Sequence, residues 1–258
     1  MSEITDHAFS LQGRTALVTG ATRGIGRACA IALGKAGASV ALGCRNLAEG
    51  KVLAAEMQQQ GINAFAVKMD MLSLTAINQA INQVATLSDG KIDILVNNAG
   101  LSHPAAALDV TAEDFDEMFF LNVKGAFFAA QAVARGMKTQ GGGTIINIAS
   151  QAGVVALPGE PVYCMTKAAM IHMTKCLAAE WAQYHIRVNA VAPTFTRTDS
   201  TQHWLNDPAV LASLIGRIPL GRVAETDDIA APVVFLASGA SAMITGATLA
   251  IDGGWTIV

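Results

Sequence analysis

Seven short apolar runs, rich in β-branched residues, recur along the chain, and this recurrence restricts the possible folds more than any other feature. The runs lie at 15–19, 39–43, 64–67, 94–96, 144–148, 187–191 and 248–251. Segments with helical spacing lie between them, at 25–36, 48–59, 74–87, 112–138 and 163–184. The runs are almost continuously hydrophobic, as strands are when helices cover both faces of a parallel sheet. This alternation predicts an α/β, doubly wound fold with a mostly parallel, seven-stranded sheet flanked by helices. Such sheets bind ligands at the carboxyl ends of their strands.

Neither a repeat nor a change in composition divides the 258 residues, so we expect a single domain over 1–258. The least regular stretch is 194–222, which contains Pro208 and Pro219 and directly follows Pro193. Long irregular segments inside compact domains are usually functional. We therefore predict a substrate lid at about 194–222.

Charge and hydropathy argue against several classes of partner. Lys and Arg number 17 against 20 Asp and Glu, and the resulting net charge of −3 disfavours nucleic-acid binding. Mean hydropathy is +0.41, yet no window approaches the ~18 apolar residues that a spanning helix needs, so we expect no membrane partner. The acidic N-terminal residues do not resemble a secretory signal, which favours a cytoplasmic location.

Cysteine and histidine spacing does not indicate a metal site or a disulfide framework. The four cysteines form no CxxC pair, and we expect reduced, mostly buried thiols at Cys29, Cys44, Cys164 and Cys176. The histidines lack any metal-ligand spacing, so we expect no catalytic metal. His103 and His203 could border a substrate pocket.

A glycine-rich turn joins the first predicted strand to the first predicted helix. Gly20, Gly24 and Gly26 follow the run 15–19, and Ile25 opens the helical pattern. Glycines in such a turn let the backbone approach a pyrophosphate, and the helix N-terminus offers it unpaired N–H groups. The spacing is G-x-x-x-G-x-G rather than G-x-G-x-x-G. From spacing alone, glycines that serve only packing are an equally good interpretation.

The end of the second strand indicates which dinucleotide would bind. Folds that bind NAD place an acidic residue there to hold the ribose hydroxyls, whereas this chain has Arg45 and Asn46. With Arg23 in the glycine turn, Arg45 could bind a ribose phosphate through charge-assisted hydrogen bonds. This favours NADP(H), with NAD(H) possible. The alternative is that Arg45 is an ordinary solvated arginine.

Tyr163 and Lys167 lie four residues apart at the start of a long helical pattern, so their side chains share one face. A nearby ammonium would lower the phenol pKa from its usual value near 10 by favouring phenolate. Such a phenol could exchange protons with a substrate. Taken alone, the pair is more often an aromatic anchor beside a solvated lysine.

The residues around this pair resemble the short-chain dehydrogenase/reductase family, in its single-domain branch. The resemblance extends from Gly13 to Trp255. Its motifs, in order, are Thr19-Gly20-x-x-x-Gly24-x-Gly26, Asp70, Asn97-Asn98-Ala99-Gly100, Asn122, Ser150 at the end of a strand, Tyr163-x-x-x-Lys167, and Asn189 with Pro193. The family fold is Rossmann-like, in agreement with the prediction from the strand pattern.

The resemblance implies four catalytic residues. Tyr163 would be the general acid/base that exchanges a proton with the substrate oxygen, and Ser150 would hydrogen-bond the same oxygen. Lys167 would lower the Tyr163 pKa and bind the nicotinamide ribose, while Asn122 would hold a water that connects the site to solvent. The bland alternatives are a strand-end turn residue for Ser150 and a buried helix-bending amide for Asn122.

The resemblance also implies cofactor contacts. Asp70 would bind the adenine amino group, Asn98 to Gly100 would line the adenine ribose side, and Thr196 and Thr198 would meet the carboxamide. The complete expected set is Gly20, Thr22, Arg23, Gly24, Ile25, Gly26, Arg45, Asn46, Asp70, Met71, Asn98, Ala99, Gly100, Tyr163, Lys167, Pro193, Thr196 and Thr198. The chain departs from the family at Thr194, where the family usually has glycine, so Thr194 must adopt a negative φ or tolerate strain.

We expect an NADP(H)-preferring oxidoreductase that interconverts a secondary alcohol and its ketone. Gln151, Glu160 and Ser102 could hydrogen-bond substrate hydroxyls, which favours a polyol or a small carbonyl compound. A β-ketoacyl thioester reductase and a non-catalytic dinucleotide sensor are the alternatives. The helices at 123–134 and 163–184 are apolar over much of their surface, and the resemblance implies a homotetramer that uses them together with the strand at 247–252.

Overall fold

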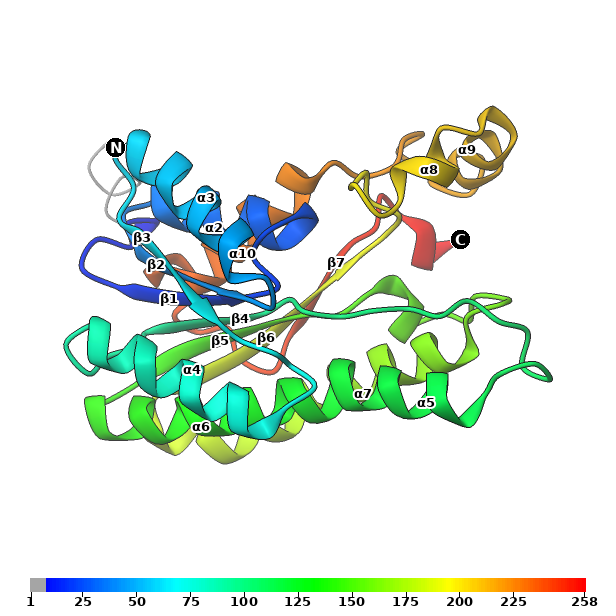
Figure 1. Ribbon diagram of the computed structural model, residues 1–258. Helices are drawn as coiled ribbons and strands as arrows, with labels where there is room; N and C mark the ends of the chain where they lie inside the picture. The colour runs from blue at the N-terminus through cyan, green and yellow to red at the C-terminus, as the bar shows by residue number, and fades with distance from the viewer. Residues whose placement is uncertain (1–7) are drawn as a thin grey trace.

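A computed structural model of the protein describes residues 8–258, so the acidic N-terminal residues before them lie outside the described part. Seven parallel strands form one sheet in the order β3-β2-β1-β4-β5-β6-β7 (Figure 1). The order reverses between β1 and β4, and such a switch point opens a crevice at the carboxyl ends of the strands. The predicted fold class is confirmed.

The seven strands coincide with the seven predicted apolar runs or extend them by at most two residues at either end. Their bounds are β1 (Thr15–Thr19), β2 (Ser39–Cys44), β3 (Ala64–Lys68), β4 (Ile94–Asn97), β5 (Gly143–Ile148), β6 (Ile186–Pro193) and β7 (Thr248–Ile251). In β1 all five residues are buried. Alternate residues of this strand enter different cores, because Ala16 and Val18 face one core and Leu17 the other. This explains why the runs are continuously apolar.

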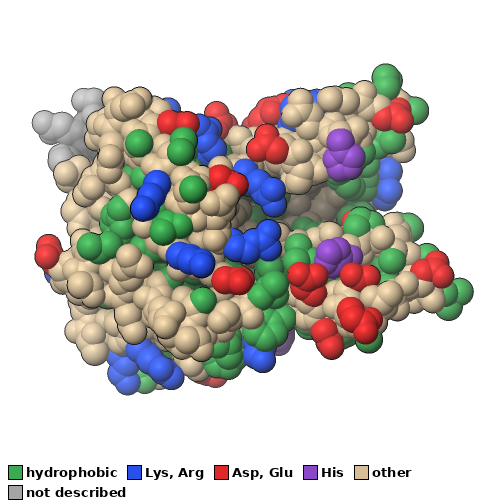
Figure 2. Space-filling view, in the orientation of Figure 1, with side chains coloured by type: hydrophobic (Ala, Val, Ile, Leu, Met, Phe, Trp, Pro, Cys, Tyr) green, Lys and Arg blue, Asp and Glu red, His purple; other side chains and the backbone are tan. Residues whose placement is uncertain are grey.

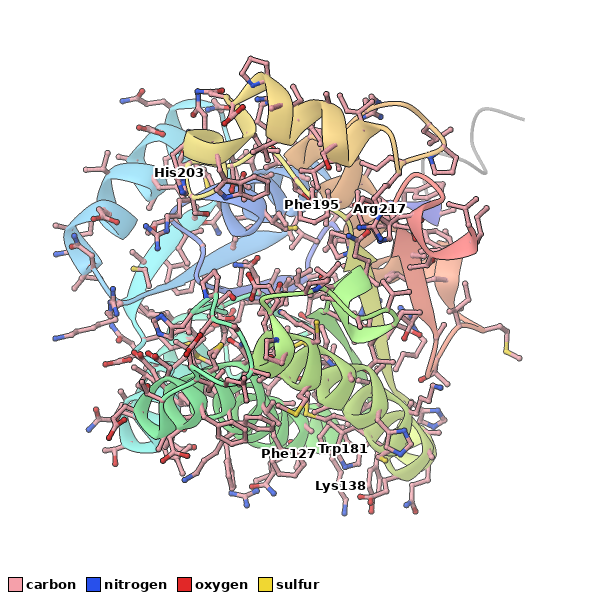
Figure 3. All side chains as sticks on the ribbon, turned by 90° about the vertical axis from the view of Figure 1, so that its right-hand side faces the viewer. Phe127, Lys138, Trp181, Phe195, His203 and Arg217 are labelled. Carbon is pink, nitrogen blue, oxygen red and sulfur yellow. The ribbon has the colours of Figure 1, made fainter. Side chains whose placement is uncertain are left out.

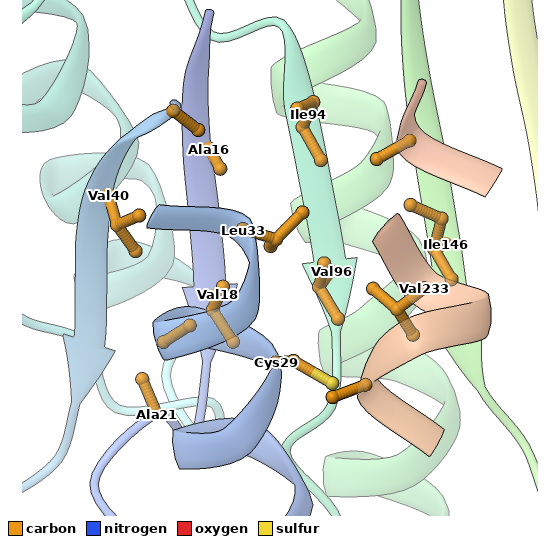
Figure 4. Close-up of a cluster of buried hydrophobic side chains, with 14 of the residues drawn as sticks. Ala16, Val18, Ala21, Cys29, Leu33, Val40, Ile94, Val96, Ile146 and Val233 are labelled. Atoms are coloured by element: carbon orange, nitrogen blue, oxygen red, sulfur yellow. The ribbon is translucent and has the colours of Figure 1, made fainter. Parts of the chain in front are cut away.

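Helices cover both faces of the sheet. One face carries α2 (Gly24–Lys35), α3 (Leu47–Gln59) and α10 (Thr226–Ala237), and the other carries α4 (Leu74–Leu87), α5 (Ala112–Phe119), α6 (Ala126–Gln140) and α7 (Pro161–Trp181) (Figure 1). Figure 4 shows the first core, in which Cys29 and Leu33 of α2 and Val233 of α10 pack onto strand residues. The short helical turns are η2 (Gln151–Gly153), η3 (Ala182–Tyr184), η4 (Gly239–Ser241) and η5 (Trp255–Ile257).

The predicted helix at 112–138 is interrupted. Between α5 and α6, η1 (Phe120–Gly125) widens to a π-helix that contains the buried Asn122. Such local widening is uncommon and is frequent at functional sites.

The predicted lid region contains more regular structure than its sequence suggests. Within it lie α8 (Gln202–Leu205) and α9 (Pro208–Ile215). A separate small core anchors them, in which Leu205, Ile218 and Val223 pack with Trp255 from the C-terminal end of the chain. This region is therefore a packed unit rather than an irregular loop.

All four cysteines are free thiols, but only Cys29 and Cys44 are buried; Cys164 is partly exposed and Cys176 exposed. The expectation of mostly buried thiols is thus half right. None of the helices within residues 8–258 has the length and apolar content needed to span a membrane. The described residues also contain no cluster of three His, Cys, Asp or Glu placed to hold a metal ion.

Candidate active site

The glycine turn has the backbone conformation that its sequence requires. Gly20 and Gly24 have φ values of +63° and +52°, in the left-handed region that L-residues with side chains rarely occupy. A Cβ on Gly26 would lie 2.4 Å from both Asn98 Nδ2 and Gly20 O. Glycine is therefore required at these positions by conformation and by close approach, and packing is part of the reason.

The same turn fits a pyrophosphate. The first turn of α2 contains no acid, and the residue before the helix, Arg23, makes no side-chain capping hydrogen bond within the described structure. The first N–H groups of α2 and the positive end of the helix dipole thus meet no acid within the first turn of the helix. A cofactor phosphate is the kind of group that such a turn accommodates.

Two exposed arginines lie near this turn, Arg23 before α2 and Arg45 directly after β2. Within residues 8–258 neither guanidinium forms an ion pair. The nearest acid along the chain after Arg45 is Glu49, and its carboxylate already accepts a hydrogen bond from Asn46 Nδ2 at 2.6 Å. Asn46 also caps α3, so its side chain has a structural role besides the predicted cofactor contact.

Asp70 and Met71 follow β3, beside the end of β2. The Asp70 side chain accepts a hydrogen bond from Leu72 N at 3.0 Å through Oδ1, which fixes the turn and leaves its other oxygen for a ligand. Met71 is buried, and its carbonyl lies against Gly125 of η1. Met71 thus contributes packing between the sheet edge and η1.

Asn98, Ala99 and Gly100 extend β4 toward the glycine turn. Asn98 Nδ2 donates to Thr19 O at 2.9 Å and to Gly20 O at 3.1 Å. The buried Thr19 hydroxyl accepts from the N–H groups of both Asn98 and Ala99, at 3.0 Å each. The side chain of Asn98 therefore holds the two edges of the crevice together. Thr19, which was part of the sequence motif but not a predicted site residue, does the same.

The start of the segment at 194–222 reaches the glycine turn. A Cβ on Gly24 would lie 3.3 Å from the Thr198 methyl carbon, so Thr198 and the turn share one part of the crevice. Thr196 is buried and donates to Thr194 O at 2.9 Å. Thr194, next to Pro193, is free of the strain considered above, because among described non-glycine residues only Asp89 and His185 have positive φ.

Ser150, Tyr163 and Lys167 gather at the carboxyl end of β5. Ser150 follows this strand and precedes η2, while Tyr163 and Lys167 lie one turn apart on α7. Ser150 is close enough to Tyr163 to lower the pKa of its phenol, and Lys167 Nζ is 5.5 Å from the Tyr163 ring centroid. Lys167 is buried, and its ammonium donates to Ile148 O at 2.8 Å. The expected constellation is therefore assembled, with Lys167 buried rather than solvated.

The direction of the Tyr163 pKa shift is opposite to the one predicted from Lys167. The pKa of Tyr163 is raised to about 12, mainly because the phenol is desolvated; Ser150 lowers the pKa, and the charges of Glu160 and Cys164 raise it. Burial also lowers the pKa of Lys167 to about 8. Its ammonium is therefore largely lost at the pH where the phenol titrates, so the protein's own groups hold Tyr163 protonated near neutral pH.

Asn122 connects three parts of the site. Its Oδ1 accepts from Leu101 N, and its Nδ2 donates to Leu101 O, both at 2.9 Å. The second Nδ2 proton goes to Thr166 Oγ1 at 3.1 Å. Both amide protons are thus used, and only one acceptor position of Oδ1 is left to hold a water. Sequence reasoning missed Thr166, whose only signal is its place between Tyr163 and Lys167.

The wall of the crevice next to Tyr163 is acidic. Figure 2 shows a hollow on this face, with acidic side chains gathered below it. The Ser102 hydroxyl hydrogen-bonds the half-buried carboxylate of Glu160. Farther out, His103 Nε2 lies 2.9 Å from Glu117 Oε2. On the lid, His203 is exposed on α8 (Figure 3).

Comparison with known proteins gives a consistent result. A family model described as enoyl-(acyl carrier protein) reductase matches residues 20–256. D-threitol dehydrogenase of Mycolicibacterium smegmatis is 41% identical over 252 residues, which covers 98% of this chain and 96% of that protein. The 2-dehydro-3-deoxy-D-gluconate 5-dehydrogenase of Dickeya dadantii is 38% identical and covers 96% and 98%. A crystal structure of gluconate 5-dehydrogenase from Burkholderia cenocepacia, in complex with NADP and tartrate, superposes with a TM-score of 0.95 at 37% identity, over 98% of this chain and 99% of that one.

Proposed function

Because this chain belongs to the short-chain dehydrogenase/reductase family of oxidoreductases, we propose that it interconverts a polyol and the corresponding ketose, with NADP(H) as the preferred cofactor. The observation that carries the proposal is the assembly of Ser150, Tyr163 and Lys167 beside the glycine turn, at the carboxyl edge of the sheet. A non-catalytic dinucleotide sensor would have no use for a phenol held between a hydroxyl and a buried amine.

Each catalytic side chain has a distinct part. A bound nicotinamide supplies the hydride exchange with the substrate carbon. Tyr163, protonated near neutral pH, donates its proton to the carbonyl oxygen in reduction, and its deprotonated phenolate form accepts the alcohol proton in oxidation. Ser150 donates a hydrogen bond to the same oxygen and stabilises the charge that develops there. Lys167 and Asn122 fix the position of the phenol through α7 and η1, and the remaining acceptor position of Asn122 holds the water that links the site to solvent.

The NADP(H) preference rests on the two exposed arginines, Arg23 and Arg45, and on the lack of an acid at the end of β2. A phosphate on the ribose would give both guanidinium groups a doubly charged partner. The gluconate 5-dehydrogenase described above binds NADP, which supports the same choice.

The substrate class rests on the polar side chains at the crevice and on the relatives. Ser102, Glu160 and Gln151 offer hydrogen-bonding groups near Tyr163 that a hydrocarbon ketone or a thioester would leave unused. The relatives described above act on polyols or sugar acids by their names. In this proposal the segment at 194–222 serves as the substrate lid. A cytoplasmic location is also part of the proposal.

The assembly that we propose is a homotetramer. An apolar groove of about 970 Å³ has α5, η1 and α6 on one side and α7 on the other. Phe127 and Trp181 lie along it (Figure 3). On another side of the molecule, β7 is an edge strand whose Leu249 is 38% exposed. Two separate surfaces of this kind suit two two-fold axes. Light scattering should give four times the chain mass of 26.7 kDa, and a stable monomer would contradict this assembly.

A spectrophotometric panel tests the function. Purified protein is assayed with neutral polyols, their ketoses and β-ketoacyl thioesters, each with both cofactors. We expect turnover of polyols and ketoses, with NADP(H) favoured. Turnover of thioesters alone would replace the proposed substrate class, and turnover of no alcohol or carbonyl compound would refute the function.

A further inference from the structure

We propose that Glu160, held in place by Ser102, makes the substrate crevice select uncharged polyols or ketoses and reject sugar acids. This inference rests on the oxidoreductase function proposed above and adds to it the charge of the substrate. The relatives do not decide this property, because their names include both a neutral polyol and sugar acids as substrates.

Glu160 is held in place by contacts between two loops. It immediately precedes α7 and lies three residues before Tyr163. The Ser102 hydroxyl hydrogen-bonds its carboxylate, and the neighbouring backbone reinforces this link, because Ala105 N donates to Gly159 O at 2.8 Å. Two loops, one after β4 and one before α7, are thereby joined beside the phenol. The carboxylate is half-buried and has a fixed position.

The charge of Glu160 acts directly on the reacting end of the site. Of the charged side chains, the Glu160 carboxylate is one whose field raises the pKa of the Tyr163 phenol. No cation within residues 8–258 forms an ion pair with it. A substrate carboxylate brought beside it would meet a like charge a few ångströms away, in a medium less polar than water. Such a repulsion weakens binding by between about tenfold and a hundredfold.

The hydrogen-bonding groups favour the same substrates. A carboxylate can only accept hydrogen bonds, so Glu160 needs a donor from the ligand. A polyol hydroxyl can donate to this carboxylate, whereas an aldonate carboxylate cannot donate at all. Buried acceptors left unmatched cost binding free energy.

Arg217 is the cation that could instead have attracted the carboxylate of a sugar acid. Its guanidinium stacks on Trp255, at 4.1 Å from the ring centroid, on the lid side of the crevice near Phe195 (Figure 3). Glu160, which precedes α7 and lies three residues before Tyr163, is the acid whose charge raises the pKa of the phenol, whereas the Arg217 guanidinium is held on the Trp255 ring.

The test uses pairs of substrates that differ only at one terminal carbon: threitol and threonate, xylitol and xylonate, glucitol and gluconate. The kcat/KM for NADP⁺-dependent oxidation is measured for wild type, Glu160→Gln, Arg217→Ala and the control Glu113→Gln, which removes an exposed carboxylate from the first turn of α5. For wild type we expect the neutral member to exceed the acid by about tenfold or more. Glu160→Gln should reduce this ratio by a similar factor, mainly by improving the acid, and the other two variants should leave it unchanged.

Salt provides a measurement on the unmodified enzyme. Because salt screens a repulsion between like charges, the wild-type ratio should fall as sodium chloride is added. If wild type oxidises the sugar acids with the same kcat/KM as their neutral partners, the inference is overturned and the oxidoreductase function remains intact. An unchanged ratio in Glu160→Gln, or a loss of acid turnover in Arg217→Ala, would overturn the role of Glu160. A wild type that oxidises no member of any pair would refute the function itself.

Discussion

Replacing Arg45 with alanine should convert the proposed NADP(H) preference into near indifference between the two cofactors. Arg45 lies directly after β2 and is exposed, and neither it nor Arg23 forms an ion pair within the described residues. Its guanidinium is therefore available to a ribose phosphate without first giving up a protein partner. Because NAD(H) lacks this phosphate, its affinity should not depend on Arg45.

The magnitude follows from the exposure of the side chain. A hydrogen bond to a charged group contributes about 1.5–3 kcal/mol when shielded, and an exposed ion pair contributes about 1 kcal/mol or less. A bidentate contact by a solvent-accessible arginine should lie between these limits, at about 2 kcal/mol. This corresponds to a loss of roughly 30-fold in NADPH affinity. For NADH we expect a change of less than about threefold.

Isothermal titration of NADPH and NADH into wild type and Arg45→Ala measures both losses directly. Arg14→Ala is the matched control, because Arg14 is also an exposed arginine. It precedes β1 and so lies at the amino ends of the strands, away from the crevice. The control variant should leave both affinities unchanged. Equal losses for the two cofactors in Arg45→Ala would refute a ribose-phosphate contact, and so would an unchanged NADPH affinity.

Two further predictions concern the glycine turn and the phenol. Gly26→Ala places a Cβ 2.4 Å from Asn98 Nδ2 and Gly20 O, so overpacking should cost about 1–3 kcal/mol and lower the melting temperature by roughly 2–12 °C. The control is Gly136→Ala on α6, whose Cβ meets nothing within 4 Å and which should raise the melting temperature slightly. A Gly26→Ala variant as stable as wild type would show that close packing is not required in the turn. In polyol oxidation, kcat/KM should rise with pH as Tyr163 loses its proton. Glu160→Gln should move this rise to lower pH, because the Glu160 charge raises the Tyr163 pKa. A pH profile that the substitution does not move would show that this charge does not act on the phenol.

The parts of the fold that could be predicted are those in which local pattern and tertiary environment agree. The strands are buried on both faces, and their runs of Val, Ile, Leu and Ala show this directly. The helix α10 escaped prediction because Pro232 lies inside it and proline normally interrupts a helical pattern. The helices α8 and α9 are short, and the small core that anchors them depends on Trp255, which lies far away in the sequence.

The candidate site was predictable where chemistry requires one residue type at one spacing. Tyr163, Lys167 and the glycines are of this kind. The pKa of Tyr163 was not predictable, because the sequence shows the lysine one turn away but neither the burial of Lys167 nor the desolvation of the phenol. The contacts of Thr19, Thr166 and the Ser102–Glu160 pair also depend on chain segments that only the fold brings together.

Activity of the Tyr163→Phe variant is the most direct test of the central claim, that this phenol exchanges the proton with the substrate oxygen. The substitution removes only the hydroxyl and keeps the ring. We expect kcat for a polyol substrate to fall by about a hundredfold or more, with NADPH affinity within about twofold of wild type. Turnover that survives the loss of the hydroxyl, with the cofactor still bound, would contradict the mechanism.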